Sequence, residues 1–149
     1  IMPNTPALVG EAVTAICPNA NITDGEKQEI VELIASFGLA QIVSEKIMDA
    51  VIAVSGSSPA YVFMFIEAMA DAAVAEGMPR VQAYQFAAQS VLGSAKMVLE
   101  TGKHPGELKD MVCSPSGTTI EAVKVLEEKG FRSSIIEAMS ACADKSRNM

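Results

Sequence analysis

Apolar positions in the first third of the chain form two short runs separated by one helical pattern. Residues 7–17 alternate loosely between apolar and polar side chains and precede a proline, which predicts a short strand closed by a turn. Thr23 and Glu26 have the spacing of a capping box, and apolar residues then recur at helical spacing until Gly38. Residues 39–43 are expected to add one more short strand. The pattern therefore predicts the tail of an α/β domain whose earlier strands lie outside this sequence.

After residue 44 the pattern becomes almost purely helical. Gly56 is expected to end one helix, and Ser58 to cap the next one with Pro59 in its first turn. No charge occurs between residues 81 and 95, and such a helix is expected to be buried on all sides, inside a dimer. The predicted helices span residues 45–54, 58–77, 79–102, 105–112 and 118–129, with a last one beginning near residue 131.

The predicted fold class is mainly α, with a short α/β segment over residues 1–43 and an all-helical domain over residues 44–149. Half of the 149 residues are apolar, only 19% are charged, and tryptophan is absent. This composition leaves little polar material to cover the surface of a monomer. Some apolar surface is therefore expected to meet another subunit.

Charge and cysteine content exclude several classes of partner. The formal net charge is −7 and the lysines and arginines do not cluster, so no nucleic acid is expected to bind. The longest charge-free stretch, residues 50–66, contains Gly, Ser and Pro and is shorter than the roughly 20 apolar residues of a membrane span, so no membrane helix is expected. Three isolated cysteines and one histidine predict no metal site and a reducing, cytoplasmic compartment. The chain begins with isoleucine and without a leader, which is expected of a cut chain.

The loop 113–117 consists of small residues and runs directly into a helix. Free backbone N–H groups at a helix N-terminus point at one spot, with the positive end of the helix dipole behind them. The hydroxyls of Ser114, Ser116, Thr118 and Thr119 surround that spot. Because the loop carries no lysine or arginine, it suits a singly charged group, such as the carboxylate of an amino or imino acid, better than a polyphosphate.

Serine and threonine also cap many helices without binding a ligand, and spacing alone favours this structural interpretation of the loop. Two other segments contain small polar residues: Met2–Pro6, where two prolines stiffen a turn, and Ser55–Ala60, where a helix is expected to break. A structural role explains each of them when it is taken alone. His104 is interpreted as a surface loop residue, and Cys113 as a packing residue.

Several motifs, taken in order along nearly the whole chain, resemble those of pyrroline-5-carboxylate reductases. No single motif suffices, but their order and spacing make the resemblance specific. The motifs are Met-Pro-Asn-Thr-Pro-Ala at 2–7, Ser-Glu-Lys-Ile-Met-Asp-Ala at 44–50, Gly-Ser-Ser-Pro-Ala-Tyr at 56–61, His-Pro-Gly-Glu-Leu-Lys-Asp-Met-Val at 104–112, Ser-Pro-Ser-Gly-Thr-Thr at 114–119 and Gly-Phe-Arg-Ser at 130–133.

The resemblance implies that residues 1–43 are the remnant of a Rossmann domain and that residues 44–149 form a helical domain for substrate binding and dimerisation. In this family a hydride passes from NADPH or NADH to the C=N carbon of 1-pyrroline-5-carboxylate, which gives L-proline. A homodimer is implied, and in several members such dimers gather into larger rings. Thr119, or a water that it orients, is implied to assist protonation of the imine. The implied substrate-binding residues are Val112, Ser114, Pro115, Gly117, Thr118 and Thr119. The implied cofactor-binding residues are Asn4, Thr5 and Pro6.

The sequence departs from the family where Ser58 and Ser116 replace the more frequent glycine. A serine at position 116 tolerates a positive φ less well than glycine does. No G-x-G-x-x-G region is present, so the chain is expected to be inactive by itself. Two alternatives remain open. One is a related imine or β-hydroxyacid reductase, which typically uses a helix lysine as acid and base; Lys96, Lys103 and Lys109 are present, but none lies in a matching motif. The other is a non-catalytic helical dimerisation module.

Overall fold

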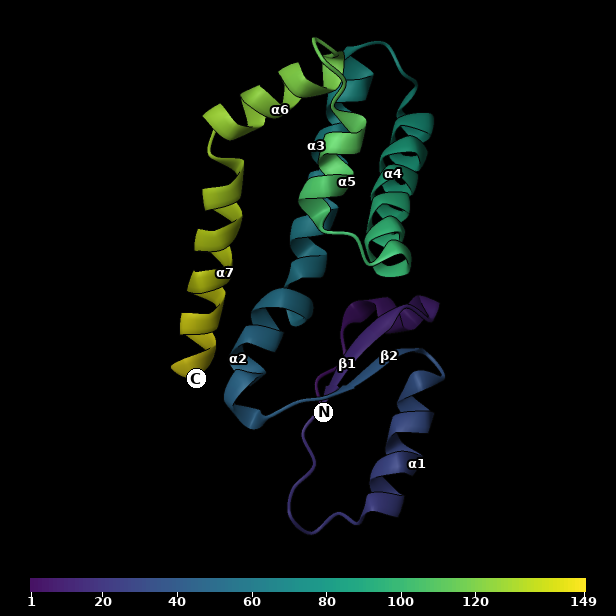
Figure 1. Ribbon diagram of the computed structural model, residues 1–149, viewed down its shortest axis with the longest axis vertical. Coiled ribbons are helices and arrows are strands. Elements are labelled where there is room, and N and C mark those ends of the chain that lie inside the picture. Colours follow the sequence, from purple (N-terminus) through teal and green to yellow (C-terminus); the bar gives the residue numbers. More distant parts are fainter. The chain divides into compact units, whose positions relative to one another are not determined.

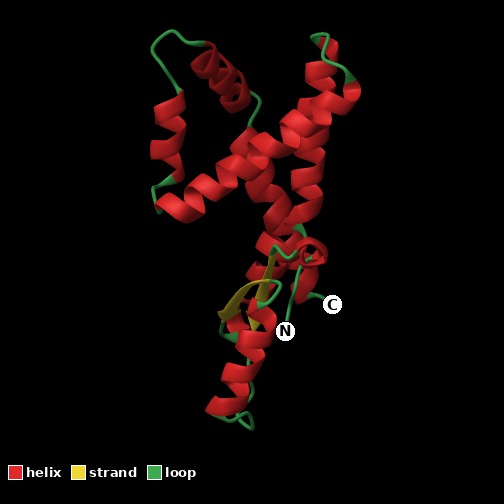
Figure 2. Ribbon diagram, turned by 90° about the vertical axis from the view of Figure 1, so that its right-hand side faces the viewer, coloured by secondary structure: helices red, strands yellow, loops and turns green.

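The computed structural model describes residues 1–149. Helices dominate it, and its one sheet has two strands (Figure 2). This confirms the mainly α fold with a short α/β segment at its start. The strands are β1 (Ala12–Ile16) and β2 (Gly38–Ile42), and the α-helices are α1 (Asp24–Ala35), α2 (Met48–Val51), α3 (Ser58–Ala75), α4 (Arg80–Thr101), α5 (Pro105–Val112), α6 (Thr118–Glu128) and α7 (Phe131–Arg147).

The chain divides into two compact units. One comprises residues 1–62 and 136–149, and the other comprises residues 63–135. Helices α3 and α7 each contribute to both units. The units group residues by proximity, whereas the predicted boundary after residue 43 separates two kinds of secondary structure. That boundary stays a prediction.

The first unit contains a strand–helix–strand arrangement. Strands β1 and β2 pair in parallel, beginning with Ala12 opposite Gly38, and α1 connects them (Figure 1). On the other edge of β1, Met2 exchanges two backbone hydrogen bonds with Ala15, of 2.8 and 3.1 Å. Strand β1 is therefore held from both sides, and the segment around Met2 is tied to it.

Helix α1 begins where the sequence predicts. The Thr23 side-chain oxygen accepts a hydrogen bond from the Glu26 N–H at 3.3 Å, and the Glu26 carboxylate accepts one from the Thr23 N–H at 2.9 Å. These two bonds confirm the capping box. The helix ends at Ala35 and β2 begins at Gly38, so the strand predicted over residues 39–43 is confirmed with a shift of one residue.

The strand predicted over residues 7–17 is wrong in its first part. Thr5–Val9 form a 3-10 helix, and the strand starts only at Ala12. Pro6 fixes φ in the first turn of this helix, and Gly10 closes it in the left-handed conformation with a φ of 77°. The backbone preferences of Pro6 and Gly10 therefore favour a 3-10 helix here, although the side chains alternate loosely as in a strand.

The break predicted at Gly56 is a π-helical turn and does not interrupt the helical path. This π-turn, Ile52–Gly56, is closed by a hydrogen bond of 2.8 Å from the Ser57 N–H to the carbonyl of Ile52, five residues earlier. Pro59 has no N–H, so the regular bonding pattern cannot pass through that position. The π-turn accommodates one extra residue, and the helical path continues as α3. The sequence had predicted a C-cap followed by a new N-cap at this point.

In the second unit, α3 and α4 pack through small side chains. Ala70, Ala83 and Ala87 form the buried cluster between these helices. The helix predicted to be buried on all sides buries only Ala83 and Ala87 within one chain, which leaves apolar surface for a partner. Large exposed apolar side chains of α4 are Val81, Phe86, Leu92, Met97 and Leu99.

The helical stretch Glu45–Ala75 is long and apolar enough, by length and composition, to cross a membrane. It includes the π-turn, so the glycine and proline that were expected to interrupt it do not end it. One such stretch is weak support for a membrane location, because helices that pack against another subunit have the same composition. The lack of a membrane-spanning segment stays a prediction.

Candidate functional site

The loop between α5 and α6 is a tight turn made by Ser114, Pro115, Ser116 and Gly117. The Gly117 N–H donates to the Ser114 carbonyl at 3.0 Å, and Ser116 has a φ of 57°, the one positive φ outside the glycines. Proline at the second position and a positive φ at the third are typical of a type II turn, which favours glycine at the third position. The conformation that serine tolerates less well is therefore the one that Ser116 adopts.

Gly117 allows a close approach within this turn. A Cβ atom at Gly117 would lie 2.3 Å from the Ser114 Oγ and 3.1 Å from the Ser114 carbonyl oxygen. The Ser114 hydroxyl thus fills the space that a side chain at Gly117 would need. Because Gly117 is the N-cap of α6, this hydroxyl lies at the N-terminus of that helix.

The N-terminus of α6 has no side-chain cap. The first N–H groups of a helix lack intrahelical acceptors, and the loop supplies none for those of Thr118, Thr119 and Ile120. The hydroxyls of Thr118 and Thr119 accept no N–H of this turn. The alternative in which these side chains serve only to cap the helix is therefore not supported by the geometry.

The charge around this helix start suits one negative charge. Its nearest acidic residue in the helix, Glu121, pairs with Lys124 at 3.0 Å, and no lysine or arginine lies in the loop. The attraction for an anion therefore comes from the free N–H groups and the helix dipole, which fits a carboxylate better than a polyphosphate. Ser114, Pro115 and Thr118 are exposed, whereas Gly117 and Thr119 are half-buried.

The predicted substrate residues lie together with one exception. Five of them form the turn and the first two positions of α6, while Val112 ends α5. Val112 lines a shallow apolar hollow between α4 and α5 together with Leu108 and Val98. The structure therefore places an apolar side chain on the last turn before the polar loop.

The predicted cofactor residues belong to the other unit, and Asn4 has a structural role there. Its side-chain oxygen accepts a hydrogen bond from the Val13 N–H of β1 at 3.0 Å. Thr5 is exposed and Pro6 half-buried in the 3-10 helix that follows. The Asn4 oxygen is occupied by the backbone, so its NH₂ group and the Thr5 hydroxyl are what this turn offers to a ligand.

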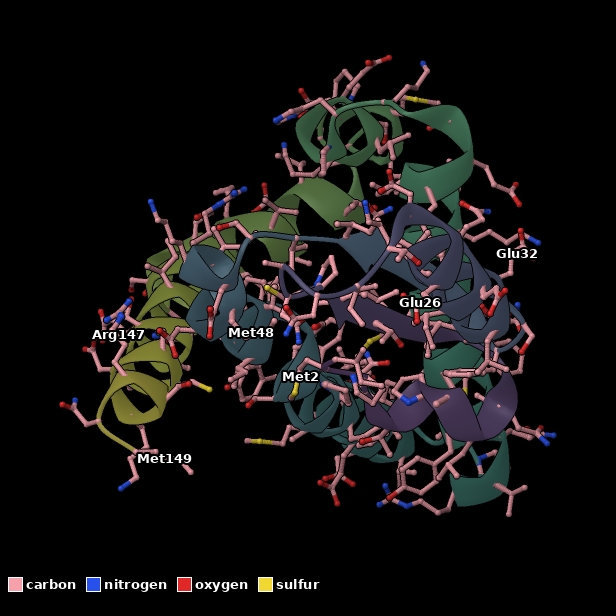
Figure 3. All side chains as sticks on the ribbon, turned by 90° about the horizontal axis from the view of Figure 1, so that it is seen from below. Met2, Glu26, Glu32, Met48, Arg147 and Met149 are labelled. Atoms are coloured by element: carbon pink, nitrogen blue, oxygen red, sulfur yellow. The ribbon has the colours of Figure 1, made fainter.

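The motif at residues 56–61 supports the turn at Met2. A Cβ atom at Gly56 would lie 2.8 Å from the terminal methyl of Met2, a side chain labelled in Figure 3, so glycine leaves room for that thioether. On the other side, the Cys142 thiol of α7 donates to the Ser57 hydroxyl at 3.1 Å. Burial, followed by the hydrogen bond with Cys142, raises the pKa of the Tyr61 hydroxyl. All of these contacts fall within one compact unit.

His104 differs from its sequence interpretation as an ordinary loop residue. It is exposed, but it is the N-cap of α5, and its Nδ1 accepts a hydrogen bond from the Gly106 N–H at 3.0 Å. A histidine followed by proline, just before a helical pattern, was the available signal, since proline is frequent at the first helical position. No group of three or more His, Cys, Asp or Glu side chains is placed to hold a metal ion.

The lysines of the alternative reductase are engaged in ion pairs with acidic residues close to them in the sequence. Lys96 pairs with Glu100 and Lys103 with Glu107, at 3.4 and 2.6 Å. The hydrogen bond to Asp110 raises the pKa of Lys109 above its ordinary value. A lysine that exchanges protons at neutral pH needs a lowered pKa, so Lys109 is a poor acid–base group.

Residues 45–149 match the family model described as "Pyrroline-5-carboxylate reductase dimerisation". The chain is 64% identical over 148 residues to the pyrroline-5-carboxylate reductase of Escherichia coli (strain K12), an alignment that covers 99% of this chain and 55% of the relative. It is 50% identical over 149 residues to that of Methanosarcina acetivorans, covering 100% of this chain and 55% of the relative. The chain therefore spans about half the length of the curated relatives it matches.

Solved structures agree with this match. The Plasmodium falciparum pyrroline carboxylate reductase with NADP bound superposes with a TM-score of 0.92 at 36% sequence identity, covering 99% of this chain and 59% of that one. The pyrroline-5-carboxylate reductase of Coxiella burnetii gives a TM-score of 0.93 at 36% identity, covering 99% of this chain and 55% of that one.

Proposed function

The chain belongs to the pyrroline-5-carboxylate reductase family, and from this premise we propose that it supplies the substrate-binding and dimerising part of an enzyme that reduces 1-pyrroline-5-carboxylate to L-proline. The observation that carries the proposal is the uncapped N-terminus of α6. Its free N–H groups lie in a loop without cationic side chains. Such a site selects a small monoanion, and the carboxylate is the anionic group shared by the imine substrate and proline.

The carboxylate accepts hydrogen bonds from the N–H groups at the start of α6 and from the hydroxyls of Ser114, Thr118 and Thr119. Gly117 keeps the Ser114 hydroxyl at this position, because any side chain there would displace it. Pro115 stiffens the turn, and Val112 contributes apolar surface for the ring carbons. Binding the carboxylate at one end fixes the orientation of the C=N bond at the other.

A protonated imine accepts hydride more readily than a neutral one, so the residue closest to the imine nitrogen affects the rate. Thr119 is the candidate, acting through its hydroxyl or through a water that it orients. Its hydroxyl is a weak acid, and no carboxylic acid or histidine lies in the loop. Catalysis by this site therefore rests chiefly on orientation of the reactants, which can supply roughly 7–11 kcal/mol.

The cofactor of the whole enzyme is NADPH or NADH, which supplies the hydride when bound. Two polar groups of this chain fit the nicotinamide end, namely the Asn4 side-chain NH₂ and the Thr5 hydroxyl. The bond from the Val13 N–H to Asn4 holds that side chain in place, and Pro6 stiffens the turn behind it. A Rossmann region supplies the residues that hold the adenine and pyrophosphate, and we assign residues 1–43 to such a region.

The exposed apolar residues of α4 face a second copy of the chain in a homodimer, in agreement with the dimerisation family that residues 45–149 match. Replacing Phe86, which is 64% exposed, by Asp places a charge in that surface and shifts the chain toward monomer in sedimentation experiments. Lys96→Gln on the same helix is the matched control and leaves the dimer intact. Rings of dimers are implied by the family resemblance, and the three free cysteines are the feature that favours a reducing, cytoplasmic compartment.

The substrate site is tested by thermal melting of the chain, at fixed protein concentration, with increasing L-proline. Binding to the folded state stabilises it, by about 1.4 kcal/mol when the ligand is at tenfold its Kd. Pyrrolidine, which lacks only the carboxylate, is the matched ligand and shifts nothing. Thr119→Ala reduces the shift, whereas Ser134→Ala, an exposed hydroxyl deletion on α7, preserves it.

A shift with L-proline that survives Thr119→Ala would move the site elsewhere. Equal shifts with proline and pyrrolidine would show that the carboxylate is not recognised. No shift at any concentration, in a chain that sediments as a dimer, would favour the non-catalytic dimerisation module for this polypeptide.

A further inference from the structure

The imidazole of His104 is part of the start of α5. Its Nδ1 accepts the Gly106 N–H at 3.0 Å, and Pro105 between them has no N–H, so this is the first free amide donor of the helix. A Cβ atom at Gly106 would lie 3.0 Å from Nδ1 and 3.4 Å from Cε1 of the ring. Glycine at position 106 therefore leaves room for the His104 ring at the N-terminus of α5.

Helix α5 is short, with the His104 cap at its N-terminal end and the Ser114–Gly117 turn just after its C-terminal end. It has eight residues, about 12 Å of helix, a length that is marginal without tertiary contacts. Leu108 is its one buried side chain. At its C-terminal end, the Cys113 N–H donates to the carbonyls of Lys109 and Asp110 at 3.2 and 3.1 Å, and the turn that begins at Ser114 follows at once.

We propose that His104 is a positioning residue, which caps α5 through Nδ1 and thereby holds the Ser114–Gly117 turn at the other end of the helix. The link to substrate rests on the proposed function, because that turn is the proposed carboxylate site. With few other constraints on a two-turn helix, loss of the cap at one end lets the helix fray, and the turn follows because the chain between them is continuous.

The cap sets a chemical requirement on the ring. An acceptor at Nδ1 needs a lone pair there, so the cap requires the tautomer that carries its proton on Nε2. Asparagine places its side-chain oxygen near the position of Nδ1, and it is among the best N-cap residues. Glutamine places its oxygen one bond farther out, near Nε2, and alanine has no acceptor. The neighbouring Lys103–Glu107 ion pair of 2.6 Å does not involve the His104 side chain, so none of these substitutions removes either of its partners.

The test is amide hydrogen exchange, followed by NMR, in the wild-type chain and in His104→Asn, His104→Gln and His104→Ala. In the last two variants we expect exchange to accelerate about fivefold at Gly106, the cap acceptor's partner, and at least about twofold at Gly117, whose N–H bonds to Ser114. His104→Asn retains the wild-type rates at both positions. The side-chain ¹⁵N shifts of the wild-type ring show the Nε2–H tautomer.

Faster exchange at Gly106 with unchanged exchange at Gly117 would overturn the proposal, because the cap would then be local. Equal rates in His104→Asn and His104→Gln, or a ring that carries its proton on Nδ1, would also overturn it. The proposed function is judged separately by L-proline binding to the wild-type chain. If the chain does not bind proline, the amide exchange rates at Gly106 and Gly117 still test the role of His104.

Discussion

Two helices of this protein, α1 and α6, have N-termini that are built differently. At α1, Thr23 and Glu26 satisfy each other's backbone N–H groups in a closed capping box; Glu26 is labelled in Figure 3. At α6, the N-cap is Gly117, and no side chain caps the helix. The corresponding two positions of α6 are Gly117 and Ile120, and neither side chain has an oxygen with which to cap.

The comparison separates a structural helix start from one that is available to a ligand. Where a side chain already accepts the first N–H groups, an anion would have to displace it. Where glycine is the N-cap and no hydroxyl accepts the first N–H groups of the helix, these groups remain free. The two ends also differ in residue type: the first turn of α1 contains Asp24 and Glu26, whereas the loop before α6 contains no acidic residue, and only at α1 does a side chain accept a backbone N–H of the first turn.

The largest effect on stability and on proline binding is expected from a side chain at Gly117, which would fill the uncapped N-terminus of α6. Gly117→Val places a Cβ within 2.3 Å of the Ser114 Oγ and 3.1 Å of the Ser114 carbonyl oxygen, so the turn must rearrange. Overpacking of this kind costs about 1–3 kcal/mol of unfolding free energy, and the stabilisation by L-proline is lost with it. Urea unfolding with and without proline measures both. Gly25→Ala, in open space on α1, is the control; retained proline binding in Gly117→Val would contradict the assigned site.

Removing a hydroxyl from each helix start sharpens the contrast. Thr23→Ala deletes a cap and should lower the unfolding free energy by about 1 kcal/mol. Thr118→Ala deletes a hydroxyl that caps nothing, so the expected change is within about 0.5 kcal/mol. Both are read from urea midpoints at constant slope. Equal losses in the two variants would mean that Thr118 stabilises α6 in solution.

Ser116 tests whether the open turn carries strain. Ser116→Gly relieves a positive φ of 57° and should stabilise the chain by about 0.5–1 kcal/mol, the left-handed penalty of a side chain less the entropy of glycine. Ser94→Gly, at a regular position within α4, makes the same chemical change and should destabilise by a similar amount. Unfolding midpoints that move in the same direction for both variants would remove strain as the explanation.

The smallest effect is a pH dependence of stability that arises from the Thr23–Glu26 capping box of α1 and has no counterpart at α6. Hydrogen bonds from the Thr23 hydroxyl, and then from its backbone N–H, lower the pKa of Glu26 below its ordinary value. A carboxyl whose pKa is lowered on folding contributes stability above its unfolded pKa, roughly 4.3, and loses this contribution as the pH falls through the folded value. Thr23→Ala should therefore flatten the decline of stability below about pH 4. Parallel acid profiles of the two proteins would rule this out.

Regular elements with strong local signals were predictable from sequence. The Thr23–Glu26 box, the glycine after α4 and the proline that starts α5 mark their helix ends, because each acts through its own backbone or its nearest neighbours. The 3-10 helix at Thr5–Val9 was missed, since its alternating side chains imitate a strand. The π-turn was predicted as a break because its hydrogen bonding spans five residues, which no local rule describes.

The candidate site was predictable as a set of residues and not as an arrangement. Small residues before a helix indicate free N–H groups, and the resemblance to pyrroline-5-carboxylate reductases selected the residues that we propose to bind substrate. Sequence alone could not decide whether a hydroxyl caps the helix, because Ser114 and Gly117 are related by a turn whose geometry depends on φ at Ser116. Asn4 shows the same limit, since its partner Val13 is nine residues away.

By itself, the sequence indicated the family, the helical content and several helix boundaries, because these depend on residue type and short spacing. The monoanionic character of the loop stays a prediction. Only the tertiary structure decided which polar groups are already satisfied: the Asn4 oxygen and the His104 imidazole are occupied by backbone N–H groups, and the start of α6 is free. The physical reason is that a hydrogen bond requires an acceptor at about 3 Å in the right direction, and folding alone brings that acceptor into place.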